Sequence, residues 1–143
     1  MAKIVLIGPQ FSGKSSLVDV LFDRAFEYHY TSTIGYAVYQ LGIYLLYDCS
    51  GAEMYEMYIA NCLQDADKVF LIFDGSTSCS NQEISRWYKI YRTNCPNIPL
   101  RIVINKTDLQ QKLDLPSWLT EGNEVYHMSV KSRDIFNIPL PIQ

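Results

Sequence analysis

The stretch of the chain that decides the fold is Lys3-Ile4-Val5-Leu6-Ile7-Gly8-Pro9-Gln10-Phe11-Ser12-Gly13-Lys14-Ser15. Its first part is a short apolar run with the length of a buried strand, and Gly8 to Ser15 fits the pattern G-x-x-x-x-G-K-[ST]. The pattern opens residues 14–25, in which apolar side chains recur at helical spacing. This order of strand, loop and helix predicts backbone N–H groups that curl around a phosphate, with the helix N-terminus adding partial positive charge.

Two side chains of this motif have a defined chemistry beside a bound phosphate. Lys14 is placed to reach the β- and γ-phosphates of a nucleotide, and the Ser15 hydroxyl is placed to complete the shell of a Mg²⁺ ion, which prefers oxygen ligands. A phosphate loop does not select the base. Kinases, ATPases and GTPases therefore all remain open on this motif alone.

The rest of the chain alternates strand-like and helix-like segments, the pattern of a mainly parallel sheet covered on both faces. The clearest helix start is Ser80 followed by Glu83, the spacing of a capping box, and Pro96 ends that helix. We therefore predict an α/β fold of three layers, a P-loop NTPase with a mainly parallel six-stranded sheet flanked by helices. The predicted strands are residues 3–8, 36–41, 43–48, 68–74, 100–105 and 124–129, with further helices around residues 55–62 and 116–121.

The composition describes one globular domain, residues 1–143, with no general affinity for nucleic acid. At this length, 48% hydrophobic, 13% aromatic and 19% charged residues supply ample material for a core. Twelve Lys and Arg against fifteen Asp and Glu give a net charge of -3, so no basic field attracts a phosphate backbone. The four cysteines form no C-x-x-C pair, which argues against a zinc site. No apolar run reaches signal-peptide or membrane-span length, so we expect a soluble protein of the cytoplasm or the nucleus.

The base is indicated by Asn105-Lys106-Thr107-Asp108, which directly follows a predicted strand. An Asp carboxylate can accept two hydrogen bonds from the N1–H and the exocyclic amine of guanine, whereas adenine presents the opposite pattern along that edge. The order of motifs resembles the Ras superfamily of small GTPases over nearly the whole chain. The phosphate loop is followed by Thr33 in Thr-Ile-Gly, by Asp48-Cys49-Ser50-Gly51 as D-x-x-G, and by Ser129-Val130-Lys131 in place of S-A-K. Within the superfamily the sequence is most similar to the Rab and Ran branches.

The resemblance implies a Ras-like G domain that binds GTP or GDP together with Mg²⁺. It places the metal at Ser15, Thr33 and Asp48, and it gives catalytic roles to Lys14, Thr33 and Gly51. Phe26 is expected to stack on the base, with Lys106 on its other side. The implied nucleotide contacts are Gly8, Phe11, Ser12, Gly13, Lys14, Ser15, Ser16, Phe26, Thr33, Gly51, Asn105, Lys106, Asp108, Ser129, Val130 and Lys131. Two switch regions ordered by GTP would bind protein effectors and regulators.

The sequence departs from the family at the position that follows D-x-x-G. Ala52 stands where most relatives have the Gln that orients the attacking water, and a methyl group cannot hold a water molecule. Because phosphoryl transfer depends on positioning, we expect slow GTP hydrolysis. Gln10 would also crowd an incoming arginine finger, although it could itself position the water. The alternative is a non-hydrolysing GTP-binding interaction module, a pseudo-GTPase.

The end of the chain is the second departure. Pro139 and Pro141 preclude a regular helix where the family has its long final one, so we expect that helix to be absent or much shortened. The sheet face below it would then be bare, covered by the apolar tail, or buried against another protein or a second copy of the chain. There is no C-terminal Cys, so no prenyl anchor is expected.

Overall fold

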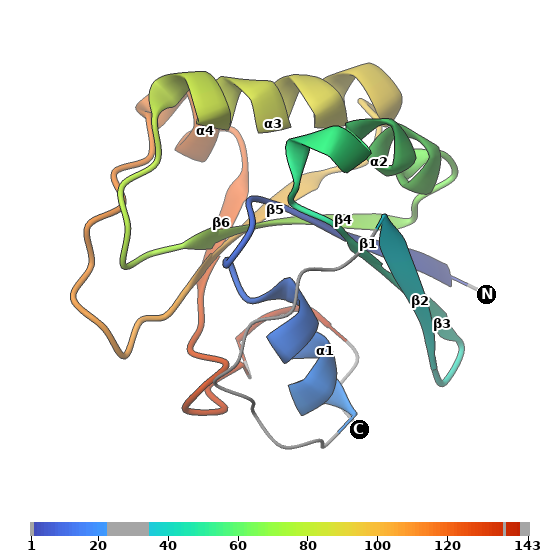
Figure 1. The fold of residues 1–143 in the computed structure, drawn as a ribbon, viewed down its shortest axis with the longest axis horizontal. Helices are drawn as coiled ribbons and strands as arrows, with labels where there is room; N and C mark the ends of the chain where they lie inside the picture. The colour runs from blue at the N-terminus through green and yellow to red at the C-terminus, as the bar shows by residue number, and fades with distance from the viewer. Residues whose placement is uncertain (1, 23–34, 136, 141–143) are drawn as a thin grey trace.

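The computed structural model describes residues 2–22, 35–135 and 137–140, which form one six-stranded sheet with helices on both faces (Figure 1). The strand order across the sheet is β2-β3-β1-β4-β5-β6. The strands are β1 (Ala2–Ile7), β2 (Tyr36–Leu41), β3 (Tyr44–Cys49), β4 (Lys68–Asp74), β5 (Leu100–Asn105) and β6 (Glu124–His127). The predicted α/β fold with a mainly parallel sheet is confirmed.

Among these six described strands, the β2 to β3 pairing is antiparallel and the other pairings are parallel. The register pairs Leu6 of β1 with Asp48 of β3, and Asp74 of β4 with Asn105 of β5. Because the carboxyl ends of parallel strands meet at one edge of a sheet, these polar residues converge beside the loop that follows β1. This edge is where a ligand site is expected in an open α/β sheet.

One face of the sheet is covered by α2 (Glu56–Leu63) and α3 (Asn81–Asn94), with the short α4 (Ser117–Thr120) beside α3, where the Trp118 and Tyr88 ring centroids lie 5.3 Å apart (Figure 1). A 3-10 turn, η1 (Glu53–Tyr55), leads into α2. The N-terminus of α3 has the predicted cap, because the Ser80 hydroxyl accepts a hydrogen bond from the Glu83 N–H at 3.1 Å. The fully buried Trp87 anchors α3 on the sheet and donates its indole N–H to Glu83 at 2.9 Å.

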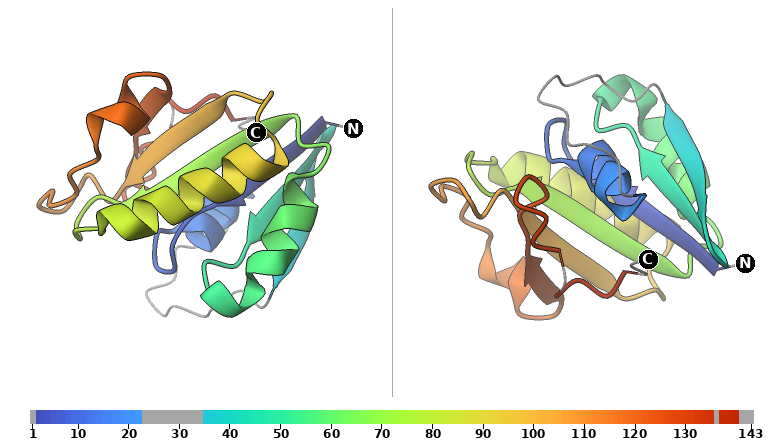
Figure 2. Two further views of the ribbon diagram at one scale, coloured as in Figure 1. Left: turned by 90° about the horizontal axis from the view of Figure 1, so that it is seen from above. Right: turned by 90° about the horizontal axis from the view of Figure 1, so that it is seen from below.

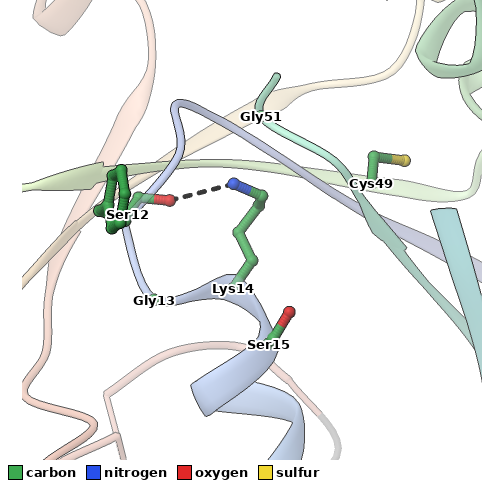
Figure 3. A pocket seen from close by; sticks show the side chains of 7 residues that line it. Ser12, Gly13, Lys14, Ser15, Cys49 and Gly51 are labelled. Atoms are coloured by element: carbon green, nitrogen blue, oxygen red, sulfur yellow. Dashed lines mark hydrogen bonds between the residues drawn. The ribbon is translucent and has the colours of Figure 1, made fainter. Parts of the chain in front are cut away.

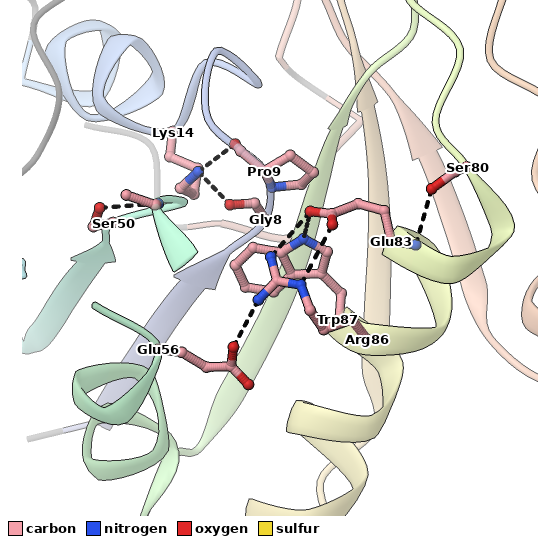
Figure 4. Close-up of polar contacts among 10 residues, drawn as sticks. Gly8, Pro9, Lys14, Ser50, Glu56, Ser80, Glu83, Arg86 and Trp87 are labelled. Atoms are coloured by element: carbon pink, nitrogen blue, oxygen red, sulfur yellow. Dashed lines mark hydrogen bonds and ion pairs between the residues drawn. The ribbon is translucent and has the colours of Figure 1, made fainter. Parts of the chain in front are cut away.

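An ion pair links the two helices of this face. Arg86 of α3 contacts Glu56 of α2 at 2.9 Å and Glu83 of its own helix at 3.0 Å, and its guanidinium lies over the Trp87 ring (Figure 4). The Arg86 side chain is only 23% exposed, so this contact is less screened than an ordinary surface pair. Helix α2, which follows the D-x-x-G turn, is therefore fastened to α3.

The opposite face is covered by α1 (Lys14–Leu21) together with the chain after β6 (Figure 2, right). Within residues 128–135 and 137–140 the structure shows turns and an isolated bridge between Ser129 and Asp134 instead of a helix. Five apolar residues of this segment are buried in one cluster with α1 and the central strands: Met128, Val130, Ile135, Ile138 and Leu140. The tail thus covers this face.

The strand ends differ slightly from the prediction for local reasons. Strand β3 begins at Tyr44 because Gly42, with φ of 63°, forms the turn that includes Ile43. Strand β6 ends at His127 because Ser129 instead pairs with Asp134. Across the part of the chain that the structure describes, no helix has the length and apolar character needed to cross a membrane.

Candidate nucleotide-binding site

The loop between β1 and α1 has a backbone that only a few residue types adopt easily. Phe11 has φ of 65° and Gly13, the N-cap of α1, has φ of 99°. Gly13 is also required by space, because a Cβ atom there would lie 2.2 Å from the Asn105 side-chain nitrogen. The loop curls around the N-terminus of α1, which is the arrangement that binds anions.

Lys14 is folded into this loop. Its ammonium donates to the Gly8 carbonyl at 2.7 Å, the Pro9 carbonyl at 2.8 Å and the Ser12 hydroxyl at 3.2 Å (Figures 3 and 4). Burial lowers the pKa of Lys14 from 10.5 to about 8, and the nearby Asp48 carboxylate acts in the opposite direction. A bound anion would favour the charged form, so Lys14 is suited to a phosphate ligand.

Two oxygen groups that could hold Mg²⁺ lie together at the same edge. The Ser15 hydroxyl donates to the Asp48 carboxylate at 2.5 Å, and Asp48 is 1% exposed. Hydroxyl and carboxylate oxygens are ligands that Mg²⁺ accepts while keeping several waters. In the described ranges no group of three or more His, Cys, Asp or Glu forms a cage for another metal. Ser15 and Asp48 therefore fit a Mg²⁺ ion that also binds a phosphate oxygen.

The D-x-x-G turn packs directly on the phosphate loop. A Cβ atom at Gly51 would lie 2.3 Å from the Gln10 backbone nitrogen, so no larger residue fits there. A small pocket opens at this junction and is lined by Phe11, Ser12, Gly13, Lys14, Ser15, Cys49 and Gly51 (Figure 3). The phosphate loop and the D-x-x-G turn therefore face one space.

The Cys49 side chain at this pocket is buried. A hydrogen bond with the Cys62 thiol and burial both raise the pKa of Cys49 well above its ordinary value. Cys49 belongs to the buried apolar cluster under α2 and α3, so its visible contribution is packing.

The Asn105 side chain ties the predicted base loop to the phosphate loop across 93 positions of sequence. Its amide nitrogen donates to the Ser12 carbonyl at 2.9 Å, and its oxygen accepts from the N–H groups of Lys106 at 2.8 Å and Val130 at 3.1 Å. Asn105 is 3% exposed. Three separate loops are thus held by one buried amide.

Asp108 lies in the exposed part of the same loop. Its carboxylate accepts the Ser129 hydroxyl at 2.7 Å, and the Thr107 N–H donates to the Met128 carbonyl at 3.2 Å. The Asn105 to Asp108 segment therefore contacts the segment from Ser129 to Lys131, in which Lys131 is exposed. An exposed carboxylate in this position can accept hydrogen bonds from the N–H groups along one edge of a base.

The remaining predicted site residues are placed as follows. Ser16 is half-buried in the first turn of α1, and Ala52 is half-buried with its N–H donating to the Ser50 hydroxyl at 3.2 Å. Phe26 and Thr33 lie outside the described residues. Sequence reasoning missed Asp74 and Gln111, which contact Lys106. Asp74 could have been suspected from the sequence, because it is an acidic residue at the carboxyl end of a buried strand, where ligand sites form in open α/β sheets.

This strand, phosphate loop and tied second loop define a phosphate-loop nucleotide-binding protein. The sequence profile of the Ras family matches residues 3–133, and this chain belongs to that family, as a Rab-like small GTPase of the Ras superfamily.

Individual relatives agree with this assignment. The chain is 30% identical to the Ras-related protein Rab-32D of Dictyostelium discoideum over 91% of its own length and 66% of that protein. It is 28% identical to the Ras-related protein YPT3 of Nicotiana plumbaginifolia, over 95% of this chain and 68% of the relative. The Ras-related protein RabZ of Dictyostelium discoideum is 29% identical over 76% of this chain and 52% of the relative. The chain thus spans about two thirds of the first two relatives and half of the third.

Proposed function

We propose that residues 1–143 form a single minimal G domain that binds GTP or GDP with Mg²⁺ and acts as a nucleotide-controlled switch for protein partners. The observation that carries this proposal is the Asn105 tie between the phosphate loop and the Asp108 loop, because it would hold the proposed phosphate-binding and base-binding groups in one fixed relation. Family membership supports the same function.

The nucleotide contacts follow from the groups at each end of the site. Lys14 and the loop amides would hold the phosphates, and Asp108 would accept hydrogen bonds from guanine. Ser15 and Asp48 would hold Mg²⁺, with Thr33 as the further ligand that the family implies. The ion would supply positive charge to the phosphate oxygens as the γ-phosphate is transferred to water.

Binding and base choice are tested by calorimetry with GTP, GDP and ATP, each with and without Mg²⁺. We expect both guanine nucleotides to bind more tightly than ATP, and Asp108→Asn to lower their affinity about 100-fold because hydrogen bonds to a charged group are lost. Asp114→Asn is the matched control, since Asp114 is an exposed carboxylate of the same loop region. Absence of GTP and GDP binding, or an unchanged base preference in Asp108→Asn, would overturn the proposal.

Slow hydrolysis is the expected kinetic behaviour. The Ala52 methyl group cannot orient the attacking water. The backbone N–H of Ala52 already donates a hydrogen bond to the Ser50 hydroxyl. This same observation favours a second candidate function, a module that keeps GTP bound without hydrolysing it. Nucleotide identified after purification, together with single-turnover phosphate release, separates the two.

Two substitutions test the cause of slow hydrolysis. Ala52→Gln should raise single-turnover phosphate release at least about tenfold by restoring the water-orienting amide. Gln10→Ala should slow it further if Gln10 positions the water. Fast phosphate release by the unmodified protein would contradict the role given to Ala52.

Protein partners are expected at the surface formed by β2, η1 and α2. Five large apolar side chains are exposed there, with exposed fractions of 41–77%: Tyr36, Val38, Met54, Met57 and Tyr58. The rings of Tyr36 and Tyr58 lie 6.4 Å apart, so the exposed groups of the two elements meet. An apolar patch next to the D-x-x-G turn suits a partner that senses the bound nucleotide.

A further inference from the structure

Lys106 has an unfavourable backbone conformation that its surroundings hold in place. Its φ of 68° lies in the left-handed region, which costs energy for a residue with a side chain. Its N–H donates to the Asn105 side chain at 2.8 Å, and its carbonyl accepts from the Leu109 N–H at 3.0 Å and the Gln111 side chain at 2.8 Å. Such over-determined strain is typical of a ligand clamp.

The Lys106 side chain is held as well, by Asp74 at the end of β4. The ammonium lies 2.8 Å from one Asp74 oxygen, and the other oxygen accepts from the Ser76 N–H at 2.8 Å and the Ser76 hydroxyl at 2.6 Å. The Asp74 side chain is 12% exposed and that of Lys106 is 31% exposed. Burial raises the pKa of Asp74, but the hydrogen bonds from Lys106 and Ser76 outweigh it and hold the pKa below its ordinary value. The Asp74 carboxylate is therefore held by hydrogen bonds to both of its oxygens, and a lowered pKa favours its ionised form.

Gln111 fastens the far side of the same loop. Its amide nitrogen donates to the carbonyls of Lys106 and Leu109, each at 2.8 Å. A Cβ atom at Gly75 would lie 2.3 Å from the Gln111 oxygen, and the Lys112 N–H donates to the Gly75 carbonyl at 2.8 Å. The loop is thus anchored to the residue that follows Asp74.

We propose that Asp74 and Gln111 are positioning residues that preorganise Lys106 for the nucleotide base and so slow nucleotide release. The inference rests on the proposed function of guanine-nucleotide binding and adds the residues that set its lifetime. A lysine already held in one direction loses less conformational freedom when the base arrives. The competing explanation is that Asp74 only stabilises the Ser76 turn.

Asp74→Asn separates these explanations because the amide oxygen can still accept from Ser76, while the amide N–H₂ group replaces the acceptor that faces Lys106. We expect a fluorescent N-methylanthraniloyl-GDP probe to dissociate about tenfold faster from this variant. Gln111→Ala should also speed release. Glu124→Gln is the matched control, because it removes the negative charge from the Arg101 to Glu124 ion pair of 3.4 Å, which lies at the amino ends of β5 and β6.

A double-mutant cycle with Lys106→Met tests whether Asp74 acts through Lys106. In the Lys106→Met background, Asp74→Asn should leave the dissociation rate unchanged. The same tenfold effect in both backgrounds, or an Asp74→Asn rate equal to that of Glu124→Gln, would overturn the inference while guanine-nucleotide binding stands. A parent protein that binds no guanine nucleotide would overturn the proposed function together with this role.

Discussion

Replacing Asn105 by Ala should destabilise the nucleotide-free protein far more than the loss of one ordinary surface amide. The side chain is 3% exposed and makes three hydrogen bonds, to Ser12, Lys106 and Val130, at 2.8–3.1 Å. Truncation leaves the buried Ser12 carbonyl, the buried Val130 N–H and the part-buried Lys106 N–H without this partner. It also removes one of the hydrogen bonds that hold the left-handed backbone of Lys106, whose carbonyl still accepts from Leu109 and Gln111.

The magnitude follows from the number of bonds. Each hydrogen bond contributes about 1 kcal/mol net, so the free energy of unfolding should fall by about 3 kcal/mol. For a domain of this size, the midpoint of thermal unfolding should then fall by about 10 °C. Water that enters the vacated space would reduce the loss to about 2 kcal/mol.

Thermal and urea unfolding followed by circular dichroism measure this effect. Asn123→Ala is the matched control, since that side chain makes a single local bond, to the Leu119 carbonyl at 2.7 Å. We expect the control to lose about 1 kcal/mol. Equal losses in the two variants would refute the view that Asn105 is the structural tie between the loops.

Three further predictions concern other parts of the molecule. Because burial lowers the pKa of Lys14 to about 8, the unfolded chain binds more protons between pH 8 and 10.5, so the unfolding free energy of nucleotide-free protein should rise by about 3 kcal/mol over this range. Lys14→Met should lack this rise. Parallel profiles of unfolding free energy against pH for the two proteins, measured by urea titration, would contradict the role given to Lys14. Ile138→Ala should lower the free energy of unfolding in urea by about 2–3 kcal/mol, because Ile138 is 3% exposed and packs against the sheet. The control Ile43→Ala, at a site that is 70% exposed, should lower it by less than about 0.5 kcal/mol. Similar losses in the two variants would mean that the tail does not cover this face of the sheet. Ser80→Ala should lower stability by about 1 kcal/mol through loss of the α3 cap, and an unchanged urea midpoint would disprove that contribution.

Strand and helix positions were predictable where the signal lies within a few residues. The apolar run of Lys68–Asp74 is a buried strand as predicted, and the Ser80 and Glu83 spacing marks the observed start of α3. The boundary of β3 was off by one residue because a turn residue, Ile43, has the same apolar character as a strand residue.

The candidate site was predictable only in part, because only some of its residues lie in a motif whose signal spans a few neighbouring positions. The phosphate-loop motif predicts its own anion-binding groups, and the motif from Asn105 to Asp108 predicts guanine as the base. Asp74 carries no motif, and its contact with Lys106 spans 32 positions of sequence. It becomes visible only when β4 and β5 lie side by side and pair Asp74 with Asn105.

The amino-acid sequence by itself determined the fold class and the two loop motifs, because periodicity, capping and glycine placement act over a few neighbouring residues. Tertiary structure alone decided that Asn105 joins three loops, that Asp74 and Gln111 hold Lys106, and that the tail residues Ile135 and Ile138 cover the sheet. Those contacts depend on strand order and parallel pairing, which bring distant carboxyl ends to one edge of the sheet.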